Sequence, residues 1–180
     1  MENKFIKKIL TDIKVELTEE FDKNFQRKAF FSKPWSQRKT GKKGSLMIAT
    51  GTLRRSITAE LTENGIRWSS SVPYSKIHNE GGEITVTAKM KRFFWAKYYE
   101  LSGKVKVNAK TKKMSKTSQR YSEEAEFYKN LALMKVGDKI VMPQRQFIGY
   151  APEVLQAINK VVEDNFKDLE TYINNLLKVK

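Results

Sequence analysis

The sequence predicts an α+β fold in which a small antiparallel sheet is packed by long helices at the two ends of the chain. Apolar residues recur at three- and four-residue steps over 3 to about 30 and again over 153 to about 177, the period of an amphipathic helix. Short β-branched stretches separated by Gly and Pro lie between these helices. Strands grouped between helices favour α+β over a parallel doubly wound sheet.

The first half begins with the long N-terminal helix, whose apolar stripe is expected to face the core. A membrane-surface helix is the alternative, which the acids interspersed along the segment disfavour. Leu53 and Ile57 are expected to share the buried face of a short helix, and Asn64-Gly65 is a typical hairpin turn. The elements predicted after the long helix are a polar loop at 31–49, a turn opening the short helix at 50–57, and strands at 58–62 and 66–72.

The second half alternates short elements with a long basic stretch. Residues 89–99 are aromatic and basic, and 104–120 are rich in lysine with almost no large apolar side chains. Ser122 is the expected cap of the helix that follows, since Ser accepts from free N–H groups at a helix start. The other predicted elements are a helical turn at 74–79, strands at 83–88 and 139–142, a helix at 123–134, and the last helix, which Pro152 precedes.

We predict one domain over residues 1–180, with a basic insertion at about 89–135. A chain of 180 residues with 39% hydrophobic and 11% aromatic residues has enough apolar material to bury one core. No stretch approaches the roughly 18–20 apolar residues of a transmembrane helix, and the N-terminus lacks the apolar run of a signal peptide. Synthesis in the cytoplasm, without a membrane partner, is therefore expected.

The chain is strongly basic. Its 35 Lys and Arg outnumber 20 acids, which gives a formal charge of +15 and a pI near 9.8. Such a charge favours nucleic acid or an acidic protein surface as a partner. Segment 89–120 is interpreted in three ways: a partner-binding arm, a direct nucleic-acid contact, or a solvated loop over a small aromatic cluster. The candidate contact residues are Lys104, Lys106, Lys110, Lys112, Lys113, Lys116 and Arg120.

Residues with catalytic potential are few. The absence of cysteine excludes disulfides, thiolate metal sites and cysteine nucleophiles, and His78 is the single histidine. Gly41 to Ser45 lacks the spacing of a phosphate-binding loop, and the acids are scattered rather than clustered as a magnesium site requires. We therefore expect no enzyme, no catalytic or metal-binding residue, and no cofactor.

Three motifs occur in order along the chain. The first runs from Thr50 to Ile57 (TGTLRRSI), the second from Val72 to Gly82 (VPYSKIHNEGG), and the third from Pro143 to Tyr150 (PQRQFIGY). Together with a helix before and after them, they resemble the signatures of the phage virion morphogenesis family of tail-completion proteins. The candidate motif and interface residues are Thr50, Gly51, Leu53, Arg54, Arg55, Ser56, Tyr74, His78, Asn79, Gly81, Gly82, Arg145, Phe147 and Gly149.

The chain departs from the family pattern in two places. Gln146 stands where proline is usual, which would loosen the turn, and the 89–135 insertion is long and very basic. The motifs are also explained by structure alone. Gly51 permits a tight entry into the short helix, Leu53 and Ile57 bury, and Arg145 and Phe147 precede the last helix as a guanidinium and an aromatic anchor.

The resemblance implies a structural subunit that finishes the tail and prepares it for head joining. It implies a homo-oligomeric ring, with six copies as the expected number, in the tail or neck region of the virion, after assembly in the host cytoplasm. The implied partners are further copies, the tail tube or terminator, head-connector proteins, and packaged DNA as a possible contact of the basic loops at 36–44 and 104–120. A stand-alone basic nucleic-acid-binding protein is the alternative.

Overall fold

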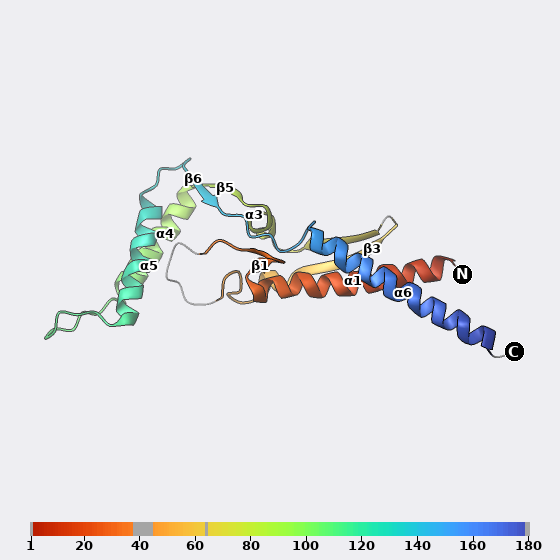
Figure 1. The fold of residues 1–180 in the computed structure, drawn as a ribbon. Coiled ribbons are helices and arrows are strands. Elements are labelled where there is room, and N and C mark those ends of the chain that lie inside the picture. The colour runs from red at the N-terminus through yellow and green to blue at the C-terminus, as the bar shows by residue number, and fades with distance from the viewer. Residues whose placement is uncertain (1, 38–44, 64, 179–180) are drawn as a thin grey trace. The chain divides into compact units, whose positions relative to one another are not determined.

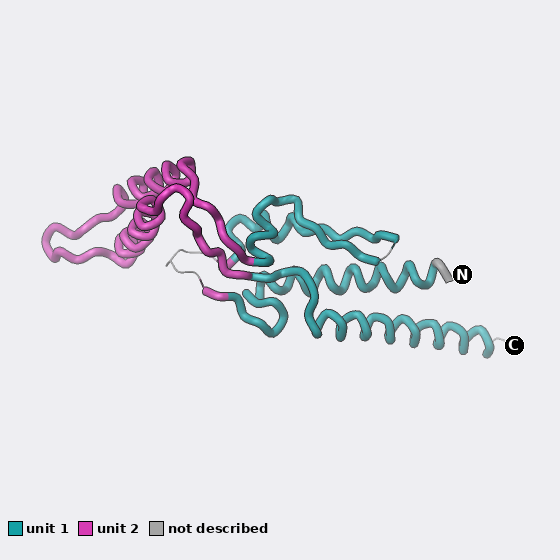
Figure 2. The backbone as a smooth tube through the Cα atoms, turned by 90° about the horizontal axis from the view of Figure 1, so that it is seen from above, with its two compact units in different colours: residues 1–35, 47–80, 145–180 teal, residues 36–46, 81–144 magenta. Residues whose placement is uncertain are grey.

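The chain folds as α+β, as the sequence predicts. The computed structural model describes residues 2–37, 45–63 and 65–178, which form six helices and six short strands (Figure 1). Two compact units divide the chain (Figure 2). Unit 1 contains residues 1–35, 47–80 and 145–180, and unit 2 contains residues 36–46 and 81–144.

Unit 1 is built on the predicted N-terminal helix, α1 (Glu2–Arg27). Ile9, Ile13, Leu17 and Phe21 recur along one face of α1 and are buried, as their spacing predicts. The helix ends slightly before residue 30 because Lys28 adopts φ 58°, outside the helical region. The chain then pairs β1 (Ala29–Phe30) with β2 (Lys33–Pro34), a small hairpin that the sequence did not predict: β1 lies at the end of the predicted helix and β2 in the predicted loop.

A short helix and a hairpin follow in unit 1. The helix α2 (Thr52–Arg55) and the antiparallel strands β3 (Ile57–Thr62) and β4 (Gly65–Ser70) confirm the predicted elements. The prediction that Ile57 shares the buried helix face is wrong, because Ile57 already begins β3 and pairs with Ser70. Asn64 in the predicted turn lies outside the described residues. The predicted helical turn is α3 (Ser75–Glu80).

The last helix, α6 (Pro152–Lys178), closes the core of unit 1. It begins at Pro152, whose missing N–H costs nothing in a first turn. Val154 is buried against α1, and Trp68 of β4 meets the ring of Phe21 edge-on at 5.4 Å between centroids. The core therefore lies between α1, α6 and the β3–β4 hairpin.

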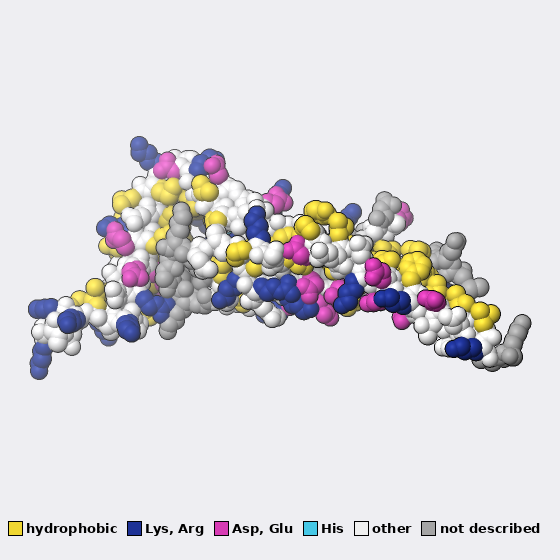
Figure 3. Space-filling model, in the orientation of Figure 1, with side chains coloured by type: hydrophobic (Ala, Val, Ile, Leu, Met, Phe, Trp, Pro, Cys, Tyr) yellow, Lys and Arg dark blue, Asp and Glu magenta, His cyan; other side chains and the backbone are white. Residues whose placement is uncertain are grey.

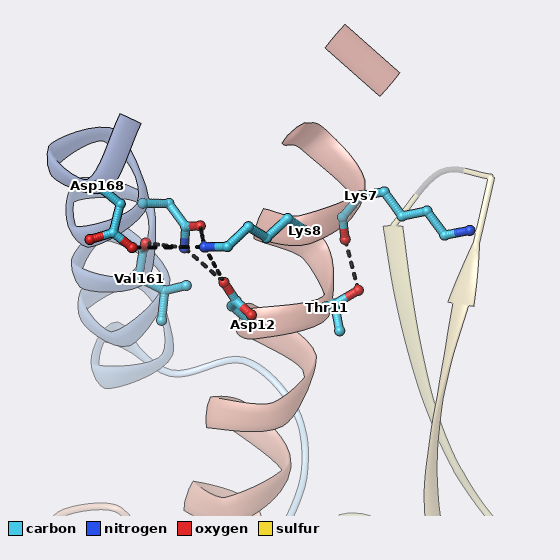
Figure 4. A network of polar contacts seen from close by, with 7 residues as sticks. Lys7, Lys8, Thr11, Asp12, Val161 and Asp168 are labelled. Carbon is cyan, nitrogen blue, oxygen red and sulfur yellow. Dashed lines mark hydrogen bonds and ion pairs between the residues drawn. The ribbon is translucent and has the colours of Figure 1, made fainter. Parts of the chain in front are cut away.

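A polar network lies within the contact between α1 and α6 (Figure 4). Asn165 is buried on α6, where Nδ2 donates to Asp12 Oδ2 of α1 and to Val161 O of its own helix, both at 3.0 Å. Lys8 of α1 donates to Asn165 Oδ1 and lies 3.9 Å from Asp168. The two helices run in opposite directions (Figure 1), and Phe5 of α1 also contacts Phe166 of α6.

Unit 2 contains two helices and one small sheet. The strands β5 (Gly82–Thr85) and β6 (Lys139–Met142) pair antiparallel and form the sheet of this unit. Among the described residues, the strands thus form three separate two-stranded sheets in place of the one small sheet predicted. The aromatic stretch at 89–99, to which no element was assigned from the sequence, is part of a helix, α4 (Ala88–Ser102). It packs against α5 (Lys116–Leu133).

The helix boundaries of unit 2 differ from the prediction because of their caps. Thr87, assigned to a strand, accepts instead from Met90 N at 3.2 Å and caps α4, which shortens β5. Ser122, the predicted cap of the next helix, lies inside α5, because Ser115 accepts from Ser118 N at 3.1 Å and starts the helix seven residues earlier. The lysine-rich loop is therefore shorter than predicted.

Candidate functional site

The second and third motifs meet in unit 1, around the backbone of residues 145–149. Asn79 Oδ1 accepts from Phe147 N at 2.9 Å and from Ile148 N at 3.1 Å. His78 O accepts from Arg145 N at 2.8 Å. The end of α3 thus holds a segment 68 residues further along the chain. We call residues 145–149 the clamped segment.

The N-terminal part of the chain holds the same segment from two further side chains. Asn24 is fully buried in α1, and its Nδ2 donates to Phe147 O at 3.2 Å while its Oδ1 accepts from Phe31 N at 2.9 Å. Trp35 Nε1 donates to Gln146 O at 2.6 Å. Trp35, which follows β2, therefore contacts the third motif directly.

Aromatic packing completes the clamp. Phe147 is fully buried, with its ring 5.2 Å from that of Phe25, which in turn meets Trp35 at 5.7 Å. Gly149 has φ 133°, and a Cβ there would lie 2.7 Å from Gln146 Nε2. That amide donates to Ile148 O at 3.4 Å, a contact that spans the turn where the family pattern has proline.

His78 lies beside this segment. Its ring is half-buried and meets Tyr74 edge-on at 6.0 Å, and its Nδ1 has no hydrogen-bond partner among the described residues. Burial, together with the positive charge of the buried Arg145, lowers the pKa of His78. The imidazole is therefore neutral at pH 7, and a general-base role would require a carboxylate or nucleophile positioned against it.

The first motif contacts α1 rather than the clamped segment. Gly51 adopts φ 76° at the start of α2, and a Cβ there would lie 2.7 Å from Arg55 Nη1. Arg54 forms a bidentate ion pair with Asp22 of α1, and Leu53 is buried. Arg55 Nη2 donates to Thr50 O at 2.9 Å. The motif is thus a structural connection between α2 and α1.

Ser56 and the paired glycines also have structural roles. Ser56 Oγ is buried, donates to Leu53 O at 2.7 Å and lies 2.7 Å from Ser70 Oγ. Gly81 has φ 74°, and a Cβ there would lie 2.9 Å from Gln144 N, so that only glycine permits this approach of two backbones. Gly82 pairs with Met142 in the β5–β6 sheet of unit 2.

The basic candidates gather at the tip of the α4–α5 hairpin in unit 2. Asn108 accepts from Lys110 N and Thr111 N at 2.9 and 3.0 Å, and Val107 pairs with Met114, which makes the loop a defined turn. Figure 3 shows dark-blue side chains around this turn. Five lysines there are exposed and form no ion pair with a described residue; they are Lys106, Lys110, Lys112, Lys113 and Lys116, and we call them the basic tip.

The remaining basic candidates flank the tip. Lys104 forms an ion pair with Glu100 at 2.7 Å. Hydrogen bonds from Lys104 and Lys97 lower the pKa of Glu100 to about 2. Arg120 is half-buried within α5. Most of the second loop predicted as basic, residues 38–44, lies outside the described residues.

Asn24 and Asn165 were not among the predicted site residues. Each lies on the apolar face of a predicted helix, where the spacing predicts another apolar side chain. Asn24 lies beside Phe21 and Phe25, and Asn165 lies between Val161 and Leu169. A polar residue on a buried stripe must find a partner, and this pattern would have identified both.

Neither a metal site nor a membrane span is found in the part of the chain that the structure describes. The residues at 2–37, 45–63 and 65–178 contain no group of three or more His, Asp or Glu arranged to hold a metal ion. No described helix is both long and apolar enough to cross a bilayer. The chemistry that the motif residues perform is hydrogen bonding and packing of the protein's own backbone.

Comparison with known proteins agrees with the motifs. The sequence model of the phage virion morphogenesis family matches residues 7–167. This range includes all three motifs, the clamped segment and the basic tip. No curated protein and no solved structure is significantly similar to the chain.

Proposed function

Because the chain belongs to the phage virion morphogenesis family, we propose that it completes the phage tail and prepares it for joining to the head. The observation that carries this proposal is the match over residues 7–167, which contains the whole of the clamp. The family is typically structural rather than catalytic, and its role is in virion morphogenesis.

The hydrogen bonds to the clamped segment support an assembly protein rather than an enzyme. The side chains of Asn24, Asn79 and Trp35 form hydrogen bonds with backbone atoms of the clamped segment. These hydrogen bonds fix the conformation of the clamped segment. In our proposal that shape is presented to neighbouring virion proteins.

We further propose that the protein acts as a homo-oligomeric ring, six copies being the number that matches the symmetry expected of a tail. Its neighbours would be the tail tube or terminator on one side and the head connector on the other, in the neck region of the virion. The basic tip would contact an acidic neighbour or the packaged DNA, since unpaired lysines attract either.

Extract complementation tests the proposal. A phage in which this gene is inactivated should accumulate filled heads and separate tails, and purified protein added to that lysate should restore joined, infectious particles. Normal particle yields without the gene product would refute a role in tail completion. Native mass spectrometry of the purified protein, alone and with isolated tails, then gives the number of copies in the ring.

A second candidate function rests on the basic tip alone. A stand-alone nucleic-acid-binding protein would bind duplex DNA as a monomer, with an affinity that falls steeply as salt rises because counterions are released from the phosphates. Tight, salt-sensitive binding by the monomer, together with normal tails in its absence, would favour this candidate.

A further inference from the structure

The C-terminal end of α6 carries apolar side chains that no described residue covers. Figure 3 shows yellow side chains along one side of this end of the helix. Leu177 is 70% exposed and Tyr172 62% exposed. They belong to a set of exposed residues spaced by three and four positions, which therefore lies on one face; its members are Tyr172, Ile173, Leu176 and Leu177, and we call it the tail face.

The tail face continues the stripe by which α6 packs in its own unit. Val154, Ile158 and Val161 contribute to the core against α1, and Phe166 meets Phe5. After this contact the same stripe turns outward to solvent for two further turns. Contiguous exposed apolar surface of this kind marks an interaction site.

The same unit contains an apolar cleft of about 560 Å³. It lies between α1, β4, α6 and the end of the clamped segment. Its two polar side chains already form hydrogen bonds: Asn79 Oδ1 accepts from Phe147 N and Ile148 N, and Trp68 Nε1 donates to Thr18 Oγ1 at 3.0 Å. The apolar lining is Leu10, Ile13, Leu17, Phe21, Ile66, Ile148, Val154 and Ile158.

Charges beside the two surfaces are complementary. Lys7 and Lys14 lie one turn before and one turn after Leu10 on α1, and neither forms an ion pair with a described residue. On α6, Glu170 lies beside the tail face and Glu163 lies seven residues earlier in the helix; both are exposed and have no ion-pair partner in the described part of the chain. The two lysines and the two glutamates are each seven residues apart, about 10.5 Å along a helix. The glutamates of a docked α6 could therefore pair with both lysines.

We propose that the tail face of one copy docks in the apolar cleft of the next copy. This inference rests on the proposed ring and names the surfaces that form it. A head-to-tail contact requires two different, complementary faces on one subunit, and it closes into a ring when the rotation permits. One apolar protrusion and one apolar cleft with opposite charges beside them provide such a pair.

Cysteine cross-linking tests the contact without background, because the chain contains no cysteine. Leu10→Cys and Leu177→Cys are made in separate proteins of different tag length and mixed under mild oxidation. We expect disulfide-linked dimers with one copy of each variant. Within one chain the two positions cannot bond, because Lys8 bonds Asn165 and Leu177 lies 12 residues further on, about 18 Å along the helix.

A charge substitution tests whether self-association requires the tail face. Leu176→Glu should weaken self-association roughly tenfold or more, since it places a charge in the docked face. Thr171→Glu adds the same charge on the opposite side of the same helix and should leave association unchanged. Both positions are exposed, so both variants should fold, which circular dichroism and urea unfolding can verify.

The outcomes separate this contact from the ring itself. Rings that persist in Leu176→Glu without any cross-link between positions 10 and 177 would overturn the contact but leave the proposed ring intact. Disulfide dimers of Leu177→Cys alone would indicate tail-to-tail pairing and also overturn it. A wild-type protein that stays monomeric, alone and on isolated tails, would overturn both the contact and the ring.

Discussion

The amide of Asn79 joins two of the three sequence motifs through two backbone hydrogen bonds. Its Oδ1 accepts from Phe147 N and Ile148 N, and Asn24 holds Phe147 O from the other side. These residues hold the clamped segment, which precedes α6 in the chain. The presence of Asn79 in the second motif is therefore explained by the hydrogen bonds that backbone N–H groups require, without a reactive side chain.

Removing the Asn79 amide should cost stability. Asn79→Ala leaves two N–H groups without their acceptor, and we expect the free energy of unfolding to fall by about 1–3 kcal/mol. Asn174→Ala, at an exposed position of α6, is the control and should change stability by less than about 0.5 kcal/mol. Urea unfolding measures both, and equal effects would contradict the role of Asn79.

The single histidine gives a prediction for the dependence on pH. Its pKa is lowered in the folded protein, so the unfolded chain binds more protons below the ordinary pKa of about 6.5. The free energy of unfolding should therefore fall as pH drops from 7 toward 5. In His78→Gln this part of the fall should disappear. A wild-type stability that is constant or rises over this range would disagree with a buried, neutral imidazole.

At the scale of elements, the contact between α1 and α6 combines an apolar seam with one buried amide. Asn165 bonds to Asp12 and Lys8, whose side chains are 41% and 53% exposed. Both charged partners can therefore return to water if the amide is lost. We therefore expect the amide to contribute more to the alignment of the two helices than to their stability.

This difference can be measured with two substitutions. Asn165→Leu replaces the buried amide with an apolar side chain of similar size and should leave the free energy of unfolding unchanged or raise it by about 1 kcal/mol. Asn165→Ala also leaves a cavity and should lower it by about 1–3 kcal/mol. A Leu variant less stable than the Ala variant would show that the polar network itself stabilises the seam.

The elements also show why some of the fold could be predicted and some could not. Both long helices follow from a clean apolar period, and β3 and β4 follow from alternation around a turn signal. The helix α4 could not be found this way, because its aromatic residues are nearly consecutive and its partner α5 decides the conformation. Thr87 illustrates the conflict: its β-branched neighbours predict a strand, yet its hydroxyl caps a helix.

The site was predictable only as a set of motifs. The spacing along the chain did not show that His78, Asn79 and Phe147 meet, while Arg54 turns to α1. Contacts between residues about 70 positions apart depend on the tertiary fold. The buried Asn24 carried a usable signal, a polar residue on an apolar stripe, and the motif pattern did not include it.

At the scale of the whole molecule, the excess positive charge is partly concentrated in the basic tip. Changing its five lysines to glutamine should leave the fold intact but reduce the yield of infectious particles. Substitution is preferable to deletion of 104–120, because Ser118 Oγ accepts from Lys106 N and helps to close the hairpin. The variant and wild type should unfold at the same urea concentration.

A matched control separates position from net charge. Five exposed lysines elsewhere, at 4, 33, 76, 89 and 160, are changed to glutamine to give the same total charge. If the basic tip contacts an acidic partner or DNA, only the tip variant should lose particle yield in a complementation assay. Equal losses in the two variants would indicate that net charge alone matters.

A cryo-electron microscopy reconstruction of the intact particle can show whether this chain is a subunit at the head-proximal end of the tail. We expect a ring of copies of this chain between the tail tube and the head connector, in which the fold of unit 1 can be recognised from α1, α6 and the β3–β4 hairpin. Purified infectious particles that lack the chain, or hold it elsewhere than at the junction of tail and head, would contradict it.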